Sequence, residues 1–270
     1  MIKNSDLIKN KGEKYGIDDL LAIMERLRQP DGCPWDREQD HHSIRNDFVE
    51  ETYEAADAID RESREDLCEE LGDVLLQIVF HCQIEREQQG FDFTDVCDGI
   101  CKKLIERHPH VFENVSVENS DEVLENWDKI KQKSKHQDTF TDTLKSVPAS
   151  YPALMRAQKI QKRAKKAGFD WDDVDGAFKK LDEEINELKA AVAEGNDSHI
   201  FEEYGDLLFS AVNVSRFLKI DSEQALNGAT NKFVSRFEKV ENLANQKEID
   251  MKSSTLETLD KLWDEAKTCE

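Results

Sequence analysis

Residues 183–206 read EEINELKAAVAEGNDSHIFEEYGD, and they contain two short acidic motifs, EExxE and ExxD. Carboxylates three or four positions apart share one face of a helix, so each motif places its acids on one side. Two such helices packed antiparallel would bring at least four carboxylates into one cluster. Unpaired charges repel strongly there because the dielectric is low. The pattern therefore predicts a helix pair whose acidic faces share a divalent cation.

The same phrase occurs earlier in the chain. Residues 50–73 read EETYEAADAIDRESREDLCEELGD, and the first Glu and the final Asp are again 23 positions apart. Other residues repeat in the same order: Trp35-Asp36 with Trp171-Asp172, Lys103 and Arg107 with Lys232 and Arg236, and Trp127-Asp128 and Lys131 with Trp263-Asp264 and Lys267. The offset between copies drifts between 129 and 136 residues, as loops of different length allow. The sequence therefore predicts two tandem copies of one helical module.

Composition and periodicity predict an all-α fold. The chain has 270 residues, of which only 11 are Gly and 5 Pro, and its long stretches are rich in Glu, Lys, Leu and Ala, which favour helices. Apolar residues recur with a period near 3.6, and no stretch alternates as a strand would. We expect a first module over 1–134, a polar linker over 135–150 and a second module over 151–270. The expected helices include 43–60, with Ser43 as its cap, and 94–107, 121–133, 154–166, 174–193, 198–218, 222–244 and 255–267.

Charge and cysteine content limit the partners and the location. The formal net charge of −22 would repel a nucleic-acid polymer, so a small anionic substrate would need a metal or a local basic cluster. No apolar run approaches the roughly 18 residues of a membrane span, and the Lys-rich start lacks a signal core. Six sparse cysteines indicate a reducing cytoplasm. Cys97 and Cys101 lack a second pair that would complete a zinc site.

The acidic motifs favour a hard cation. Oxygen ligands alone suit Mg²⁺, with Mn²⁺ as the alternative, whereas a di-iron bundle would need Glu-x-x-His motifs. An ordinary solvated acidic face is the competing interpretation. Against it stand the equal spacing of the two copies and the glycines Gly72 and Gly205 before each Asp. A helical Gly costs about 1 kcal/mol relative to Ala, so its repetition predicts close packing or a close ligand.

Basic and aromatic residues of the second copy complete a candidate phosphate site. Lys232 and Arg236 lie one helical turn apart, and beside a metal they would suit phosphate oxygens; otherwise they would form salt bridges. Asn231 adds a neutral hydrogen bond, whereas the first copy has Lys102 at that place. Trp263 either stacks on a nucleobase or packs in a core.

Other residues gave weaker signals. Trp35 and Trp171 follow turns and are expected to pin the start of each module. His41 and His42 are expected in surface or capping roles rather than as ligands or bases. There is no phosphate-binding loop of the P-loop type, and no candidate nucleophile for a covalent mechanism.

Several phrases together resemble the MazG-type nucleoside triphosphate pyrophosphohydrolases. They are Gly32-Cys33-Pro34-Trp35-Asp36, Phe48-Val49-Glu50-Glu51-Thr52-Tyr53-Glu54, Glu69-Glu70-Leu71-Gly72-Asp73 and Arg107-His108-Pro109-His110-Val111-Phe112. The likeness covers nearly the whole chain, with both tandem modules. It implies an all-α fold completed by homodimerisation, and Mg²⁺-dependent hydrolysis of NTPs or dNTPs to the monophosphate and pyrophosphate.

The resemblance also implies residue roles, with the second module as the main catalytic one. The metal ligands would be Glu184, Glu187, Glu203 and Asp206, with a second candidate site at Glu51, Glu54, Glu70 and Asp73. These ligands and Glu183 form the catalytic set. Substrate contacts would come from the acids Glu184, Glu203 and Asp206 and from Lys180, Asn231, Lys232, Arg236, Trp263 and Lys267.

The mechanistic hypothesis is attack of water on the α-phosphorus, with Glu183 or Glu184 taking the proton. The expected role is nucleotide-pool house-cleaning or nucleotide control under stress. Two other classes stay open: a nucleotide-sensing or partner-binding protein without turnover, and a purely structural acidic bundle.

Overall fold

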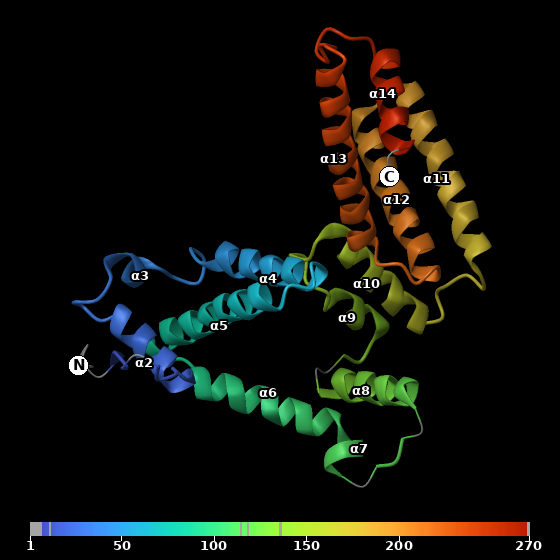
Figure 1. Ribbon diagram of the computed structural model, residues 1–270. Coiled ribbons are helices and arrows are strands. Elements are labelled where there is room, and N and C mark those ends of the chain that lie inside the picture. The colour runs from blue at the N-terminus through green and yellow to red at the C-terminus, as the bar shows by residue number, and fades with distance from the viewer. Residues whose placement is uncertain (1–6, 11, 114, 118, 135–136, 269–270) are drawn as a thin grey trace. The chain divides into compact units, whose positions relative to one another are not determined.

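The fold is built from helices throughout the residues that the computed structural model describes, which are 7–10, 12–113, 115–117, 119–134 and 137–268. This confirms the all-α prediction (Figure 1). The helices are α2 (Ile17–Leu27), α3 (Pro34–Glu38), α4 (Arg45–Asp60), α5 (Arg64–Glu87), α6 (Phe93–Arg107), α7 (Pro109–Phe112), α8 (Ser120–Ser134), α9 (Phe140–Lys145), α10 (Ala153–Lys166), α11 (Val174–Glu194), α12 (Asp197–Phe217), α13 (Ser222–Gln246) and α14 (Leu256–Thr268). Among these helices, none combines the length and apolar character needed to cross a membrane.

The chain divides into two compact units, Met1–Ile130 and Lys131–Glu270. In the first unit α4 and α5 form a helical hairpin, and α11 and α12 form the corresponding hairpin of the second unit (Figure 1). Each hairpin carries EExxE on its first helix and ExxD on its second. The repeated sequence therefore corresponds to a repeated structural element.

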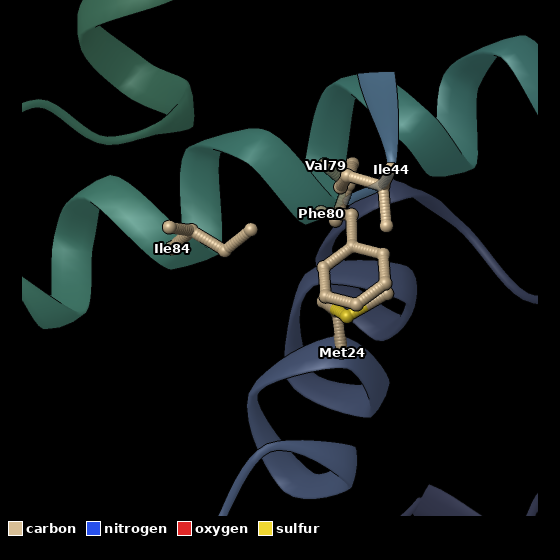
Figure 2. Packing of buried hydrophobic residues seen from close by; sticks show 5 residues of the cluster. All are labelled: Met24, Ile44, Val79, Phe80 and Ile84. Carbon is tan, nitrogen blue, oxygen red and sulfur yellow. The ribbon is translucent and has the colours of Figure 1, made fainter. Parts of the chain in front are cut away.

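The core of the first unit lies where α2 and the segment before α4 meet α5. Met24, Ile44, Val79, Phe80 and Ile84 are each at most 3% exposed. Figure 2 shows Phe80 reaching from α5 to Met24 of α2, beside Ile44 and Val79. Burial of such side chains contributes about 1.5–3 kcal/mol each, so this cluster fixes α5 and, through it, the acidic hairpin.

The two hairpin turns have the same backbone conformation at one position. Glu62 and Gly195 occupy matching places and have φ values of 54° and 69°, in the left-handed region. The next residue caps the second helix in both units: Ser63 accepts from the amide of Asp66, and Asn196 accepts from the amides of Ser198 and His199. These caps are typical helix starts. They fix where the second acidic helix of each hairpin starts, and the two helices then pack against each other.

The second unit has a further helix pair, α13 and α14. Val240, Ala244, Leu262 and Ala266 are at most 3% exposed where these helices meet, and Trp263 packs against this cluster while only partly buried. Packing of small and branched side chains lets the two helices approach closely. α13, which carries Lys232 and Arg236, is therefore fixed by α14.

One local expectation was wrong. Ser43 does not cap the helix: α4 begins at Arg45, and the Ser43 hydroxyl bonds within a turn to Asp40. Within the stretch 135–150, expected as a polar linker, the described residues from 137 onward include α9, which starts with a capping box between Thr139 and Asp142 and packs on α10. Arg163 of α10 donates to the Thr143 carbonyl and to the Ser146 hydroxyl, so these bonds attach α9 to α10.

Candidate functional site

The acidic motifs of the second unit bring together three of the four predicted metal ligands. One carboxylate oxygen each of Glu184, Glu187 and Glu203 lies within 4.8 Å of the others. Glu184 is only 4% exposed, whereas Glu187 lies open to solvent. Asp206 stands one turn after Glu203 on α12 and lies outside this group. We call Glu184, Glu187 and Glu203 the C-terminal acidic cluster.

Lys180 supplies positive charge to this cluster from one turn earlier on α11. Its Nζ lies 2.6 Å from Oε1 of Glu184, 2.7 Å from Oε1 of Glu183 and 3.9 Å from Oε2 of Glu187. The hydrogen bonds to Glu183 and Glu184 raise the pKa of Lys180. A buried carboxylate needs such compensation, because an isolated buried charge is costly.

The remaining acids repel one another. Desolvation raises the pKa of Glu187. The neighbouring carboxylates of Glu184 and Glu203 raise this pKa further, whereas the charge of Lys180 lowers it. Glu203 also contacts an imidazole, since Nε2 of His199 lies 3.0 Å from its Oε1. The hydrogen bond to Glu194, followed by the charges of Glu194 and Glu203, raises the pKa of His199. The cluster thus holds more negative charge than its neighbours fully balance.

A matching N-terminal acidic cluster lies on α4 and α5. One oxygen each of Glu51, Glu70 and Asp73 lies within 4.8 Å of the others, and Glu54 lies outside this group. Desolvation raises the pKa of Glu51, and so do the charges of Asp73, Glu54 and Glu70. Desolvation likewise raises the pKa of Glu70. Both hairpins therefore bring the second Glu of EExxE close to the Glu of ExxD: Glu51 to Glu70, and Glu184 to Glu203.

The two clusters differ in their cationic neighbours. Corresponding acids of the two motifs are 133 residues apart, and at that spacing Asp47 stands in place of Lys180 and Asp66 in place of His199. Desolvation is the largest cause of the raised pKa of Glu70, and Asp66 is one of the acidic neighbours that raise it further. The N-terminal cluster thus has acids where the C-terminal cluster has a lysine and a histidine.

An open groove of about 630 Å³ lies beside the N-terminal cluster, on the α4 and α5 hairpin. Its lining includes Glu54 and Glu70 together with the exposed Tyr53 and the cation Arg61. Arg61 bonds to Asp57 at 2.7 Å and to Asp66 at 2.6 Å. The groove is thus acidic and its lining arginine is already engaged.

The repeated Arg and Trp residues form a cation–π pair in each unit, at similar distances. The guanidinium carbon of Arg236 lies 5.0 Å from the centre of the Trp263 ring, and that of Arg107 lies 4.9 Å from the centre of the Trp127 ring. Phe233 adds a second aromatic contact to Trp263, with ring centres 5.1 Å apart. Such cation–π contacts help to orient a guanidinium group.

The other predicted substrate residues of the second unit lie on these helices. Asn231 and Lys232 are exposed on α13, whereas Arg236 is half-buried. Lys267 of α14 pairs with Asp264 at 3.0 Å, a local salt bridge of the kind that is ordinary for a cation in an acidic protein. Trp263 belongs partly to the α13–α14 core, as its core interpretation expected, and keeps part of its ring accessible.

Sequence reasoning missed one polar cluster in the first unit. Nδ1 of His41 lies 2.7 Å from Nδ1 of His81, and Nε2 of His41 lies 2.8 Å from Oε1 of Glu85. His41 is half-buried and ties the segment before α4 to α5, so its expected surface or capping role was wrong, while His42 is exposed. Their separation in sequence left no local signal for this contact.

The glycine and tryptophan expectations had mixed outcomes. A Cβ added at Gly72 or Gly205 would meet nothing within 4 Å, so packing within the described chain does not explain them. A Cβ on Gly176 would instead lie 2.5 Å from Cδ1 of Trp171, because that ring covers the start of α11. Trp171 thus packs against the start of α11 and is 44% exposed, while Trp35 is 57% exposed on α3.

Comparison with known proteins matches both units to one family. The MazG nucleotide pyrophosphohydrolase domain matches residues 39–112 and 172–241, which include both acidic hairpins. The chain is 46% identical over 256 residues to the nucleoside triphosphate pyrophosphohydrolase of Escherichia coli (strain K12), covering 93% of this chain and 97% of that protein.

Two further relatives extend the comparison. The nucleoside triphosphate pyrophosphohydrolase/pyrophosphatase MazG of Thermotoga maritima is 43% identical over 251 residues, covering 93% of this chain and 95% of that protein. The uncharacterized protein YabN of Bacillus subtilis (strain 168) is 44% identical over 250 residues, covering 92% of this chain and 51% of that protein. With two matched domains and near full-length similarity, this chain belongs to the MazG nucleotide pyrophosphohydrolase family.

Proposed function

We propose that this protein hydrolyses nucleoside triphosphates, ribo- or deoxyribo-, to the monophosphate and pyrophosphate, using Mg²⁺ or Mn²⁺ at the C-terminal acidic cluster. The observation that carries the proposal is the meeting of Glu184, Glu187 and Glu203 beside Lys180. The names of the Escherichia coli and Thermotoga maritima relatives support the reaction class. The expected role is nucleotide-pool house-cleaning or control of nucleotides under stress.

The residues present fit a hard divalent cation. Their donor atoms are carboxylate oxygens only, which Mg²⁺ and Mn²⁺ prefer, and the buried Glu184 carboxylate anchors the set. Asp206, one turn along α12 from Glu203, is the fourth proposed ligand. When bound, such an ion neutralises triphosphate charge and lowers the pKa of the attacking water.

The basic side chains would hold the substrate. Lys180 lies at the acidic cluster and can pass from Glu184 to a phosphate oxygen, while Lys232 and Arg236 on α13 suit the leaving pyrophosphate. Asn231 and Lys267 add polar contacts, and the accessible part of Trp263 offers a stacking face for the base. These groups act by electrostatic positioning, as in other phosphoryl transfers.

The bond changes balance without a covalent enzyme intermediate. The water oxygen bonds to the α-phosphorus while the bond from that phosphorus to the α,β-bridging oxygen breaks. Pyrophosphate leaves with the bridging oxygen, and the monophosphate keeps the oxygen of the water. The proton released goes to Glu183 or Glu184, and Glu183 is the exposed member of this pair.

The second unit is proposed as the main catalytic unit because of its cations. A triphosphate brought to the C-terminal cluster meets Lys180, whereas at the N-terminal cluster Asp47 stands at that place. Glu51, Glu54, Glu70 and Asp73 remain a second candidate metal site. In this proposal that site binds a metal but holds a triphosphate weakly.

A homodimer is proposed to complete the fold. α12 exposes an apolar stripe formed by Phe201, Tyr204 and Leu208, which are 85%, 55% and 42% exposed. Val234 on α13 is 61% exposed. Large contiguous apolar surfaces indicate interaction sites, and a second copy would cover this one. The free thiols of Cys33, Cys68, Cys82, Cys97 and Cys101 agree with a cytoplasmic location.

The reaction is tested by product analysis in ¹⁸O-labelled water. The purified protein is incubated with a panel of NTPs and dNTPs with Mg²⁺, with Mn²⁺, and with a chelator. We expect monophosphate and pyrophosphate, the label in the monophosphate alone, and no turnover with the chelator. Diphosphate and phosphate as products would contradict the proposal. Return of the intact triphosphate would instead favour nucleotide sensing, the second candidate function, for which the N-terminal cluster provides the motivating observation.

A further inference from the structure

The turn between α11 and α12 holds a histidine between two carboxylates. Nε2 of His199 lies 3.0 Å from Oε1 of Glu203, and Nδ1 lies 3.2 Å from Oε2 of Glu194. Gly195, with φ 69°, and the capping residue Asn196 fold the chain back sharply, so that Glu194 and His199 meet across the turn. The ring is therefore held at both nitrogens, and one of them holds Glu203.

The first unit has the same bridge with its charges reversed. At a spacing of 133 residues, Arg61 stands in place of Glu194 and Asp66 in place of His199. Nη1 of Arg61 lies 2.6 Å from Oδ2 of Asp66, so this pair also closes the hairpin turn. Closing the turn therefore does not require a histidine. In the second unit the basic member of the bridge, His199, lies on α12, the helix that carries ExxD, and it therefore also reaches Glu203.

Helix stability does not explain a basic residue at this place. His199 lies in the first turn of α12, where the helix dipole favours acids and disfavours cations. Its pairing with Glu194, whose side chain is 60% exposed, is screened by solvent and therefore contributes little to stability. Glu203 is different, because its side chain is only 14% exposed and it belongs to the C-terminal acidic cluster.

We propose that His199 is a positioning residue that fixes the carboxylate of Glu203 for the divalent cation. This inference rests on the proposed function. His199 engages Oε1 of Glu203 and leaves the second oxygen to the cation. Groups that orient a metal ligand in this way change metal affinity by about 10–100-fold when removed. Glu194 in turn fixes the ring.

Two isosteric amides separate the two ends of the bridge. In His199→Gln the amide nitrogen reaches the place of Nε2, so the contact to Glu203 is kept and the contact to Glu194 is lost. In His199→Asn the amide reaches only the place of Nδ1, so the opposite holds. Mn²⁺ binding is measured by calorimetry without nucleotide on full-length protein that carries Glu51→Gln and Glu70→Gln, so that the N-terminal acidic cluster does not contribute, with thermal unfolding in chelator as the control for folding.

We expect His199→Asn to weaken Mn²⁺ binding by about tenfold or more, His199→Gln to stay within threefold of the wild type, and both to unfold at the wild-type temperature in chelator. Equal Mn²⁺ affinity for wild type and His199→Asn would overturn the inference. So would equal losses in both variants, or a rise in KM for nucleotide with unchanged Mn²⁺ binding, which would mean that His199 touches the substrate. A wild-type protein that binds no Mn²⁺ would remove the proposed metal site itself.

Discussion

The ammonium group of Lys180 lies 2.6 Å from the buried carboxylate of Glu184, and this contact joins the two functions proposed for the C-terminal cluster. With neither metal nor nucleotide, Lys180 balances the charge of Glu184. With both present, the same ammonium group is expected to contact the triphosphate. Lys180 would thus compete with the metal cation for Glu184 and would also help to bind the triphosphate.

Lys180→Met should separate these two effects. Because the lysine no longer competes for Glu184, Mn²⁺ binding without nucleotide should tighten by several-fold. The KM for a triphosphate should rise about tenfold, which corresponds to about 1.4 kcal/mol. Calorimetry and steady-state kinetics measure the two quantities. Lys179→Met, at the exposed neighbouring position, is the control with the same change of charge. Equal effects of the two variants would show that only net charge matters.

The helical glycines predict opposite outcomes for two Gly→Ala changes. Gly176→Ala would place Cβ 2.5 Å from Cδ1 of the Trp171 ring, so we expect a loss of about 1–3 kcal/mol in unfolding free energy. Gly205→Ala meets nothing within 4 Å, so stability should be unchanged or higher by up to about 1 kcal/mol. Urea unfolding measures both. Destabilisation by Gly205→Ala in dilute monomeric protein would contradict the structure around that residue.

The half-buried imidazole pair in the first unit, His41 and His81, predicts a pH dependence of stability. Desolvation, with the neighbouring His41, lowers the pKa of His81. The unfolded chain therefore binds more protons than the folded chain below about pH 6.5. Stability should fall as the pH drops from 6.5 through the lowered folded pKa.

The acids with a raised pKa, such as Glu70 and Glu187, change the unfolding free energy with the opposite sign, because they favour the folded chain as the pH falls. The variant His81→Asn therefore separates the contribution of His81 from theirs. The variant should lose less stability than the wild type between pH 7.5 and 5.5. Urea unfolding at the two pH values measures the difference, and the exposed His42→Asn serves as the control. If the wild type and His81→Asn lose the same amount, His81 is not the titrating group.

The proposed dimer face can be tested with two equally exposed phenylalanines. Phe201 on the apolar stripe of α12 and Phe169 before α11 are 85% and 84% exposed. Burial of one phenylalanine contributes about 1.5–3 kcal/mol, and each copy in a dimer would lose one, so Phe201→Ser should raise the dimer dissociation constant by about 100-fold or more. Phe169→Ser should leave it unchanged. Sedimentation equilibrium measures both, and an unaffected dimer in Phe201→Ser would place the interface elsewhere.

The hairpins and their acidic clusters could be predicted from the sequence because their signals are local and repeated. EExxE and ExxD fix the faces of two adjacent helices, and a short turn such as that at Gly195 forces them together. Three acids of each motif set meet within 4.8 Å. Glu54 and Asp206 lie outside these groups, because a shared helix face does not fix how far each carboxylate lies from the others.

The features that the sequence did not predict depend on distant or unpatterned contacts. His41 and His81 are 40 residues apart and meet only because α2, α4 and α5 pack together. α9 is only six residues long, too short for an apolar period, although the Thr139–Asp142 capping box was a usable local signal. The reversed charges of the Arg61–Asp66 and Glu194–His199 bridges required aligned turns before they could be compared.

The central claim is that the C-terminal acidic cluster performs the hydrolysis. Pyrophosphate release with Mg²⁺ and a triphosphate is compared for Glu203→Gln and for Glu70→Gln, the matching change in the first unit, with unfolding temperatures in chelator as the control for folding. We expect Glu203→Gln to lower turnover by about 100-fold or more, since it removes one of the charges that hold the cation, and Glu70→Gln to keep most of it. Near-normal turnover of Glu203→Gln would contradict the account.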